Sequence, residues 1–70
     1  MKKHAVTIKG HRTSLSLEPE FWEAIKSIAA RQGKPLAALI AEIDAARGTQ
    51  GLSSAIRVYV LKTVLLKVGI

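Results

Sequence analysis

The sequence contains no cysteine, and this absence excludes disulfide bonds and thiolate metal sites as sources of stability. A chain of this length forms one domain and buries only about 60% of its unfolded surface, so such domains often depend on disulfides, metals or oligomerisation. Oligomerisation is the means that remains, and we expect a dimer. The lack of cysteine and of any signal peptide favours a cytoplasmic location.

Acidic residues are also few, and their distribution is uneven. The chain has 5 Asp and Glu against 11 Lys and Arg, a net charge of +6. Residues 1–17 contain no acid and four basic side chains, which are Lys2, Lys3, Lys9 and Arg12. We expect residues 1–9 to form a basic arm, and a two-fold dimer would bring both arms to one side, where they could meet phosphates. The alternative is a solvated tail that only confers solubility.

Groups of residues that could carry out catalysis or hold a metal are missing as well. The only histidines, His4 and His11, have no cysteine or carboxylate near them in the sequence, so we expect no metal and no cofactor. Ser14 and Ser16 are not accompanied by a base that a third group could orient. We therefore expect that the protein is not an enzyme.

Residues 12–17 alternate between apolar and polar side chains, the pattern of a strand with one buried face. One face carries Thr13, Leu15 and Leu17, and the other carries Arg12, Ser14 and Ser16. Because no second strand of equal quality is evident, this strand is expected to pair antiparallel with the same strand of a second copy. The chain would then be an obligate dimer without a stable folded monomer.

The preceding segment alternates too, but in a different register. Val6 and Ile8 are apolar at even positions, whereas Leu15 and Leu17 are apolar at odd ones, and a single flat strand cannot bury both sets. Gly10 lies between the two sets and could form a bulge or bend. We therefore expect residues 5–9 to extend the ribbon beyond a kink.

Two helices are predicted to follow the strand. The first begins at Glu18 or Pro19 and ends at Gly33, because Pro19 and the acids near it suit a helix N-terminus. Its apolar stripe is Phe21, Trp22, Ile25, Ile28 and Ala29, so Trp22 is expected in the core rather than stacked on a base. The second helix runs from residues 34–35 to residues 46–48, with the stripe Leu36, Leu39, Ile40 and Ile43.

The last part of the chain is ambiguous between helix and strand. Ile56, Val58 and Val60 alternate as a strand would, whereas Ser53 or Ser54 could cap a helix over residues 55–68. The caps and the length favour the helix. Charged residues interrupt this segment too often for a membrane span, so we expect no membrane partner.

The order strand, helix, helix resembles the ribbon-helix-helix family. The similarity lies in RTSLSLEPEFW (residues 12–22), AARQG (29–33) and, in part, LIAEID (39–44); LSSAIRV (52–58) is similar to the additional C-terminal segment of a small bacterial subgroup. The resemblance implies a mostly α fold with a short N-terminal strand, dimeric through an intermolecular antiparallel two-stranded ribbon. It further implies a core over residues 10–48 and a C-terminal helix within residues 49–70.

The resemblance also implies sequence-specific binding of double-stranded DNA by a homodimer that regulates transcription, with the ribbon in the major groove. By position, Arg12, Ser14 and Ser16 would contact bases. The expected phosphate contacts are Lys2, Lys3, Lys9, Lys34, Leu36 and Ala37. Family members commonly have Ser or Thr where this chain has Pro35, and loss of that hydroxyl weakens the phosphate clamp at the second helix, although Lys34 could offset the loss.

An alternative function is open at this point. The apolar C-terminal segment could dock a second protein, as in an antitoxin-like or adaptor interaction module. The two functions do not exclude each other.

Overall fold

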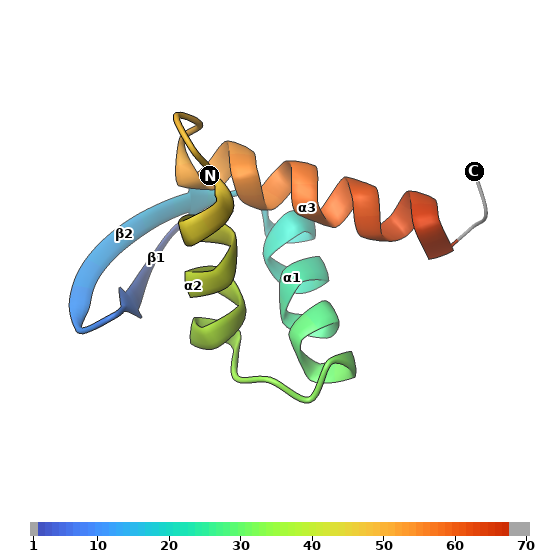
Figure 1. Ribbon diagram of the computed structural model, residues 1–70, viewed down its shortest axis with the longest axis horizontal. Coiled ribbons are helices and arrows are strands. Elements are labelled where there is room, and N and C mark those ends of the chain that lie inside the picture. Colours follow the sequence, from blue (N-terminus) through green and yellow to red (C-terminus); the bar gives the residue numbers. More distant parts are fainter. Residues whose placement is uncertain (1, 68–70) are drawn as a thin grey trace.

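A β-hairpin leads into three helices in the computed structural model, which describes residues 2–67. The elements are β1 (Lys2–Ile8), β2 (His11–Leu17), α1 (Pro19–Arg31), α2 (Leu36–Ala46) and α3 (Leu52–Lys67). The hairpin lies beside α2, and α3 crosses the ends of α1 and α2 and continues beyond α1 (Figure 1). The predicted mostly helical fold with an additional C-terminal helix is confirmed, and the last segment is a helix rather than a strand.

The hairpin turns at Lys9 and Gly10, which both have positive φ values of 51° and 80°. Two such residues match the mirror-image turns that join antiparallel strands with a native twist. From this turn β1 runs back along β2, with Ile8 opposite His11 and Lys2 opposite Leu17. The prediction that residues 5–9 extend the ribbon beyond a kink is therefore wrong, and so is the view that the chain offers no second strand. The expected arm is part of the ribbon, whose second strand comes from the same chain.

The hairpin explains the change of register in the sequence. Residues directly opposite each other in an antiparallel pair point to the same side of the sheet. Val6 is opposite Thr13 and His4 is opposite Leu15, so even positions of β1 share a face with odd positions of β2. Both apolar sets therefore point toward the helices.

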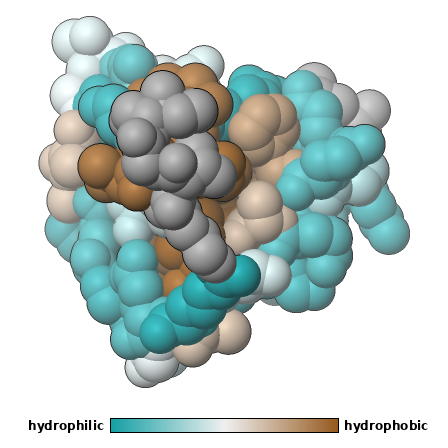
Figure 2. Space-filling model, turned by 90° about the vertical axis from the view of Figure 1, so that its right-hand side faces the viewer, coloured by the Kyte–Doolittle hydropathy of each residue, from teal (hydrophilic) through white to brown (hydrophobic). Residues whose placement is uncertain are grey.

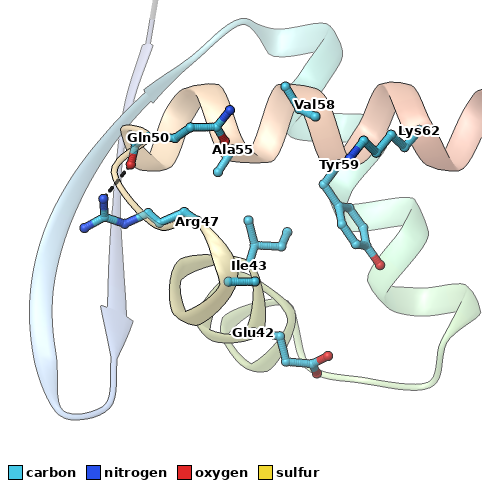
Figure 3. A pocket seen from close by; sticks show the side chains of 9 residues that line it. Glu42, Ile43, Arg47, Gln50, Ala55, Val58, Tyr59 and Lys62 are labelled. Atoms are coloured by element: carbon cyan, nitrogen blue, oxygen red, sulfur yellow. Dashed lines mark hydrogen bonds between the residues drawn. The ribbon is translucent and has the colours of Figure 1, made fainter.

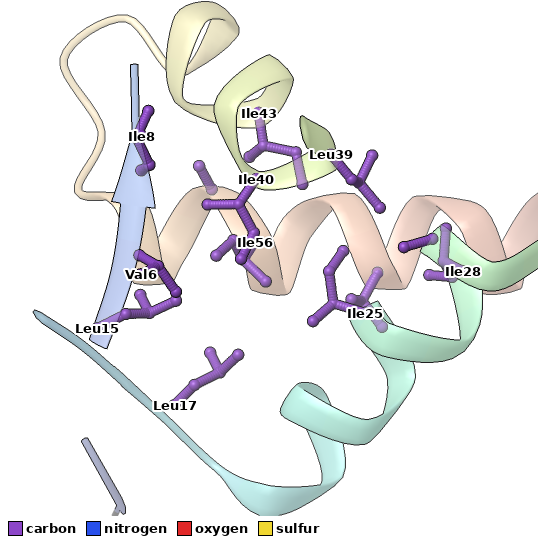
Figure 4. Close-up of a cluster of buried hydrophobic side chains, with 13 residues drawn as sticks. Val6, Ile8, Leu15, Leu17, Ile25, Ile28, Leu39, Ile40, Ile43 and Ile56 are labelled. Carbon is purple, nitrogen blue, oxygen red and sulfur yellow. The ribbon is translucent and has the colours of Figure 1, made fainter. Parts of the chain in front are cut away.

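All five elements contribute to one hydrophobic core (Figure 4). Its buried members are Val6, Ile8, Leu15, Leu17, Ile25, Ile28, Ala29, Leu39, Ile40, Ile43, Ala55, Ile56 and Val60. Within the sheet, β1 packs against α2, and β2 packs against α3. Because a single chain completes this core, the reason for expecting an obligate dimer, an unpaired strand over a shared core, does not hold.

The ends of α1 are those that the sequence predicts. Pro19 is the first helical residue, and Gly33 (φ 69°) follows the last turn in a left-handed conformation. The amide of Lys34 donates to the carbonyl of Ala29 at 3.0 Å, and that of Gly33 donates to Ala30 at 3.1 Å. These two bonds form the Schellman arrangement, which satisfies the last carbonyls of the helix.

Hydrogen bonds tie α3 to the junction between β2 and α1. Ser53 Oγ donates to the carbonyl of Ser16 at 2.8 Å, and Arg57 Nε donates to Glu18 Oε1 at 2.8 Å. The helix begins at Leu52, so the predicted capping role of the serines is wrong; Ser53 lies in the first turn and binds the strand instead. The additional helix therefore fixes the position of the ribbon relative to α1.

Candidate nucleic-acid interface

The three predicted base-contacting residues lie on one face of the hairpin, which points away from the helices. We call this the outward face; its members are Lys3, Ala5 and Thr7 on β1 and Arg12, Ser14 and Ser16 on β2. Thr7 is opposite Arg12, Ala5 is opposite Ser14, and Lys3 is opposite Ser16. All are exposed except Ser16, which is half-buried.

The half-burial of Ser16 follows from its place near α3. Its carbonyl accepts the hydroxyl of Ser53, which holds this end of β2 against the helix. Arg12 and Ser14 lie further along the strand toward the turn and are open to solvent. A double helix laid against the outward face would therefore meet Arg12 and Ser14 more easily than Ser16.

Sequence reasoning missed the β1 half of the outward face. Thr7 and Ala5 stand beside the predicted base-contacting residues because β1 folds back along β2. The signal in the sequence was a two-residue turn containing glycine between two alternating segments of opposite parity. The outward face thus presents six side chains in two rows rather than three in one.

The electrostatic character of the ribbon is uniformly positive, because residues 2–17 contain no acidic side chain. Lys3 lies on the outward face and Lys9 lies in the turn, whereas Lys2 is opposite Leu17 and belongs to the other face, although it is exposed. The first acid of the chain, Glu18, is engaged by Arg57. The hydrogen bond from Arg57 lowers the pKa of Glu18 below its usual value of 4.5.

The start of α2 offers less positive charge than the sequence suggests. Lys34 Nζ binds both carboxylate oxygens of Glu42, at 2.7 and 2.8 Å, so its charge is compensated within the chain. Pro35 is the N-cap residue and forms no side-chain capping bond. Leu36 and Ala37 open the helix, where backbone N–H groups have no carbonyl partner inside the helix and can meet an anion.

Both histidines lie on the helix-facing side of the hairpin rather than on the outward face. The ring of His4 stacks on that of Trp22 in α1, with ring centroids 3.7 Å apart and the planes inclined by 6°. Trp22 is partly buried and packs against the core, as predicted. His11 is exposed beside the turn, opposite Ile8.

The length and composition of the helices and the comparisons with known proteins complete the description of the chain. None of the helices within residues 2–67 has the length and apolar character needed to cross a membrane. No curated protein and no solved structure matched the chain. A family model described as a ribbon-helix-helix domain matches residues 1–64, which include the hairpin, α1, α2 and most of α3. The chain therefore belongs to the ribbon-helix-helix family, which in general comprises DNA-binding regulators.

Proposed function

We propose that the protein binds double-stranded DNA in a sequence-specific manner and regulates transcription, with the outward face of the hairpin in the major groove. The observation that carries the proposal is the exposed row formed by Arg12 and Ser14 on a ribbon without a single carboxylate. A B-form major groove is about 12 Å wide and admits a two-stranded ribbon. Arginine can read guanine through two hydrogen bonds, and serine can meet any base.

The proposed DNA-binding form is a homodimer. Ribbon-helix-helix proteins generally bind DNA as dimers, and β2 has a second edge that pairs with no other strand among the described residues. The bond from Ser53 covers this edge near Ser16, which leaves the part of β2 closer to the turn for a second copy. Antiparallel pairing of β2 with β2 of a second copy would give a four-stranded sheet in which each β1 is an outer strand.

The spacing of such a sheet supports different roles for its strands. Strands lie about 4.8 Å apart, so the two β2 strands would run about 2.4 Å on either side of the dyad and each β1 about 7 Å from it. The half-width of the major groove is about 6 Å. Arg12, Ser14 and Ser16 would therefore point toward bases, whereas Lys3 would stand at the rim, near phosphates.

The remaining phosphate contacts are proposed from charge and from the helix start. Lys2 begins β1 and Lys9 lies in the turn that follows it, and both would act mainly by releasing counterions. Leu36 and Ala37 would offer backbone N–H groups at the start of α2. Lys34 would contribute only when a phosphate replaces Glu42 as its partner.

Selection of bound duplexes from a random pool, followed by binding measurements with Arg12→Ala, tests the function. The variant should remain folded, lose about 1–3 kcal/mol toward the selected site and lose preference at one base pair per half-site. Replacing Lys2 and Lys3 by alanine should instead weaken selected and random DNA alike and reduce the slope of log affinity against log salt. An equal loss on both kinds of DNA for Arg12→Ala would make Arg12 a phosphate contact.

A pair of cysteine variants tests the dimer, because the natural chain has no cysteine to interfere. Ser14→Cys places the thiol on β2, and Ala5→Cys places it directly opposite, on β1. With the dyad of the proposed sheet placed at Ser14, the two Ser14→Cys thiols face each other closely enough to form a disulfide under oxidation. The two Ala5→Cys thiols would be about 14 Å apart, because three strand spacings separate them. Cross-linking through Ala5→Cys alone would show that the copies meet through β1 instead.

A further inference from the structure

A groove of about 350 Å³ lies between α2 and α3 (Figure 3). The proposed DNA contact does not use this part of the molecule. The apolar wall of the groove consists of Ile43, Ala46, Ala55 and Val58. Tyr59 lies at one end of the groove, and Gln32 Nε2 donates to its hydroxyl at 2.8 Å, which fixes the ring. The groove is therefore preformed and can receive an apolar side chain.

The apolar surface continues from this groove along α3. Val58 is 37% exposed, and Leu61, one turn further on, is 55% exposed. Further along α3, toward its C-terminal end, Val64 and Leu66 are 48% and 81% exposed. At 100° per residue these two side chains point to nearly opposite sides of the helix, so they do not form one surface with Val58 and Leu61. Brown apolar surface gathers at this end of the molecule in Figure 2. Val58 and Leu61 are neighbouring exposed apolar side chains beside the groove, and such side chains indicate an interaction surface.

Basic side chains outnumber acidic ones in the lining of the groove. The described part of α3 contains basic residues and no Asp or Glu. The acid at the groove, Glu42, is paired with Lys34, and Arg47 at the rim is paired with Asp44 at 2.7 Å. Among the described residues, no carboxylate lies within ion-pair distance of Lys62, which also lines the groove. Lys62 is therefore the cation with which an acidic side chain of a partner could pair.

We propose that the groove and the adjoining surface of α3, formed by Val58 and Leu61, dock an amphipathic helix of another protein. That helix would carry apolar side chains on one face and Asp or Glu beside them. One apolar side chain would enter the groove next to Val58, others would cover Leu61, and a carboxylate would pair with Lys62. This is helix-in-groove recognition with electrostatic selection of the partner. A second copy fits less well, because two α3 helices side by side would oppose Lys62 to further basic residues without any acid.

Fluorescence anisotropy with the full chain and two labelled synthetic helical peptides tests the proposal. Both peptides carry leucine at heptad spacing, and they differ only in having glutamate or lysine beside the leucines. The glutamate peptide should bind at least about tenfold more tightly, as expected for a partner selected by charge. Lys62→Glu should reverse that preference. Lys26→Glu, an equal charge change on the exposed side of α1, should leave it unchanged.

The groove itself is tested by Val58→Glu, with circular dichroism to verify that the variant is folded. This change should abolish binding of the glutamate peptide and leave DNA binding as in the natural chain. The proposal would be overturned by equal affinity for the two peptides, by no binding of either, or by equal effects of Lys62→Glu and Lys26→Glu. Binding to phosphatidylserine vesicles without peptide discrimination would assign the surface to membranes, and self-association in sedimentation that Val58→Glu abolishes would assign it to a second copy.

Discussion

The contact between Arg57 and Glu18 joins two residues that are 39 positions apart in the sequence, at 2.8 Å. Because the hydrogen bond from Arg57 lowers the pKa of Glu18, the folded chain keeps this carboxylate ionised at pH values where the unfolded chain takes up a proton. The contribution to stability is complete above about pH 4.5 and is lost as the pH falls from there through the lowered pKa.

Urea denaturation on both sides of pH 4.5 measures this effect. The natural chain should lose stability as the pH falls through this range, and Arg57→Gln should flatten the dependence because it removes the main cause of the shift. The comparison between the two chains, rather than either curve alone, isolates the pair. Identical pH dependence in both chains would refute this account of Glu18.

Leu17 has no exposed surface, although it lies only two residues before α1. Leu17→Ala should reduce the free energy of unfolding by about 2–5 kcal/mol, because it removes buried methyl groups and leaves a cavity. The same change at Leu66, which is 81% exposed, should alter it by less than about 0.5 kcal/mol. Chemical denaturation compares the two, and similar effects would mean that Leu17 is not part of the core.

At the scale of elements, sequence reasoning located β2 and the three helices because each carries a local pattern. Pro19 and Gly33 give the two ends of α1, and alternation gives the strand. The row of Arg12, Ser14 and Ser16 follows from the same alternation. These features depend on residues within a few positions of each other, which is the range over which a sequence can be read directly.

The hairpin and the contacts of α3 were missed because they depend on pairing across the chain. Opposite parity in two neighbouring segments predicts a kink in one strand, but a two-residue turn between two strands produces the same pattern. No local pattern indicates that Ser53 binds Ser16, 37 positions earlier, or that Glu42 pairs with Lys34. The pairing of Glu42 with Lys34 changes the candidate site, because Lys34 is one of the cations expected to bind phosphate.

The hairpin turn should be sensitive to substitution for a purely conformational reason. A Cβ at Gly10 would meet no heavy atom within 4 Å, but the φ of 80° is unfavourable for any side chain. Gly10→Ala should therefore cost about 1–2 kcal/mol of unfolding free energy. Gly51→Ala is the comparison, because that position is equally open and has no positive φ; it should cost only about 0.5 kcal/mol, since glycine is preferred to alanine at the residue that precedes α3. Equal costs at the two positions would contradict the turn geometry.

At the scale of the whole molecule, a core completed within one chain changes what dilution should do. A homodimer that forms through the free edge of β2 should dissociate into folded monomers rather than unfold. Circular dichroism should therefore retain its helical signal at concentrations at which sedimentation detects monomer only. Loss of that signal together with the dimer would restore the obligate dimer expected from the sequence.

The stacking of His4 on Trp22 gives the molecule a built-in optical probe. Trp22 is the only tryptophan in the chain, so the intrinsic emission at long excitation wavelengths comes from a single ring in α1. That ring is in contact with one side chain of β1, and separation of the strand from the helix would change the surroundings of the indole. Stopped-flow fluorescence can therefore measure the rate at which β1 packs against α1, independently of helix formation and without any label.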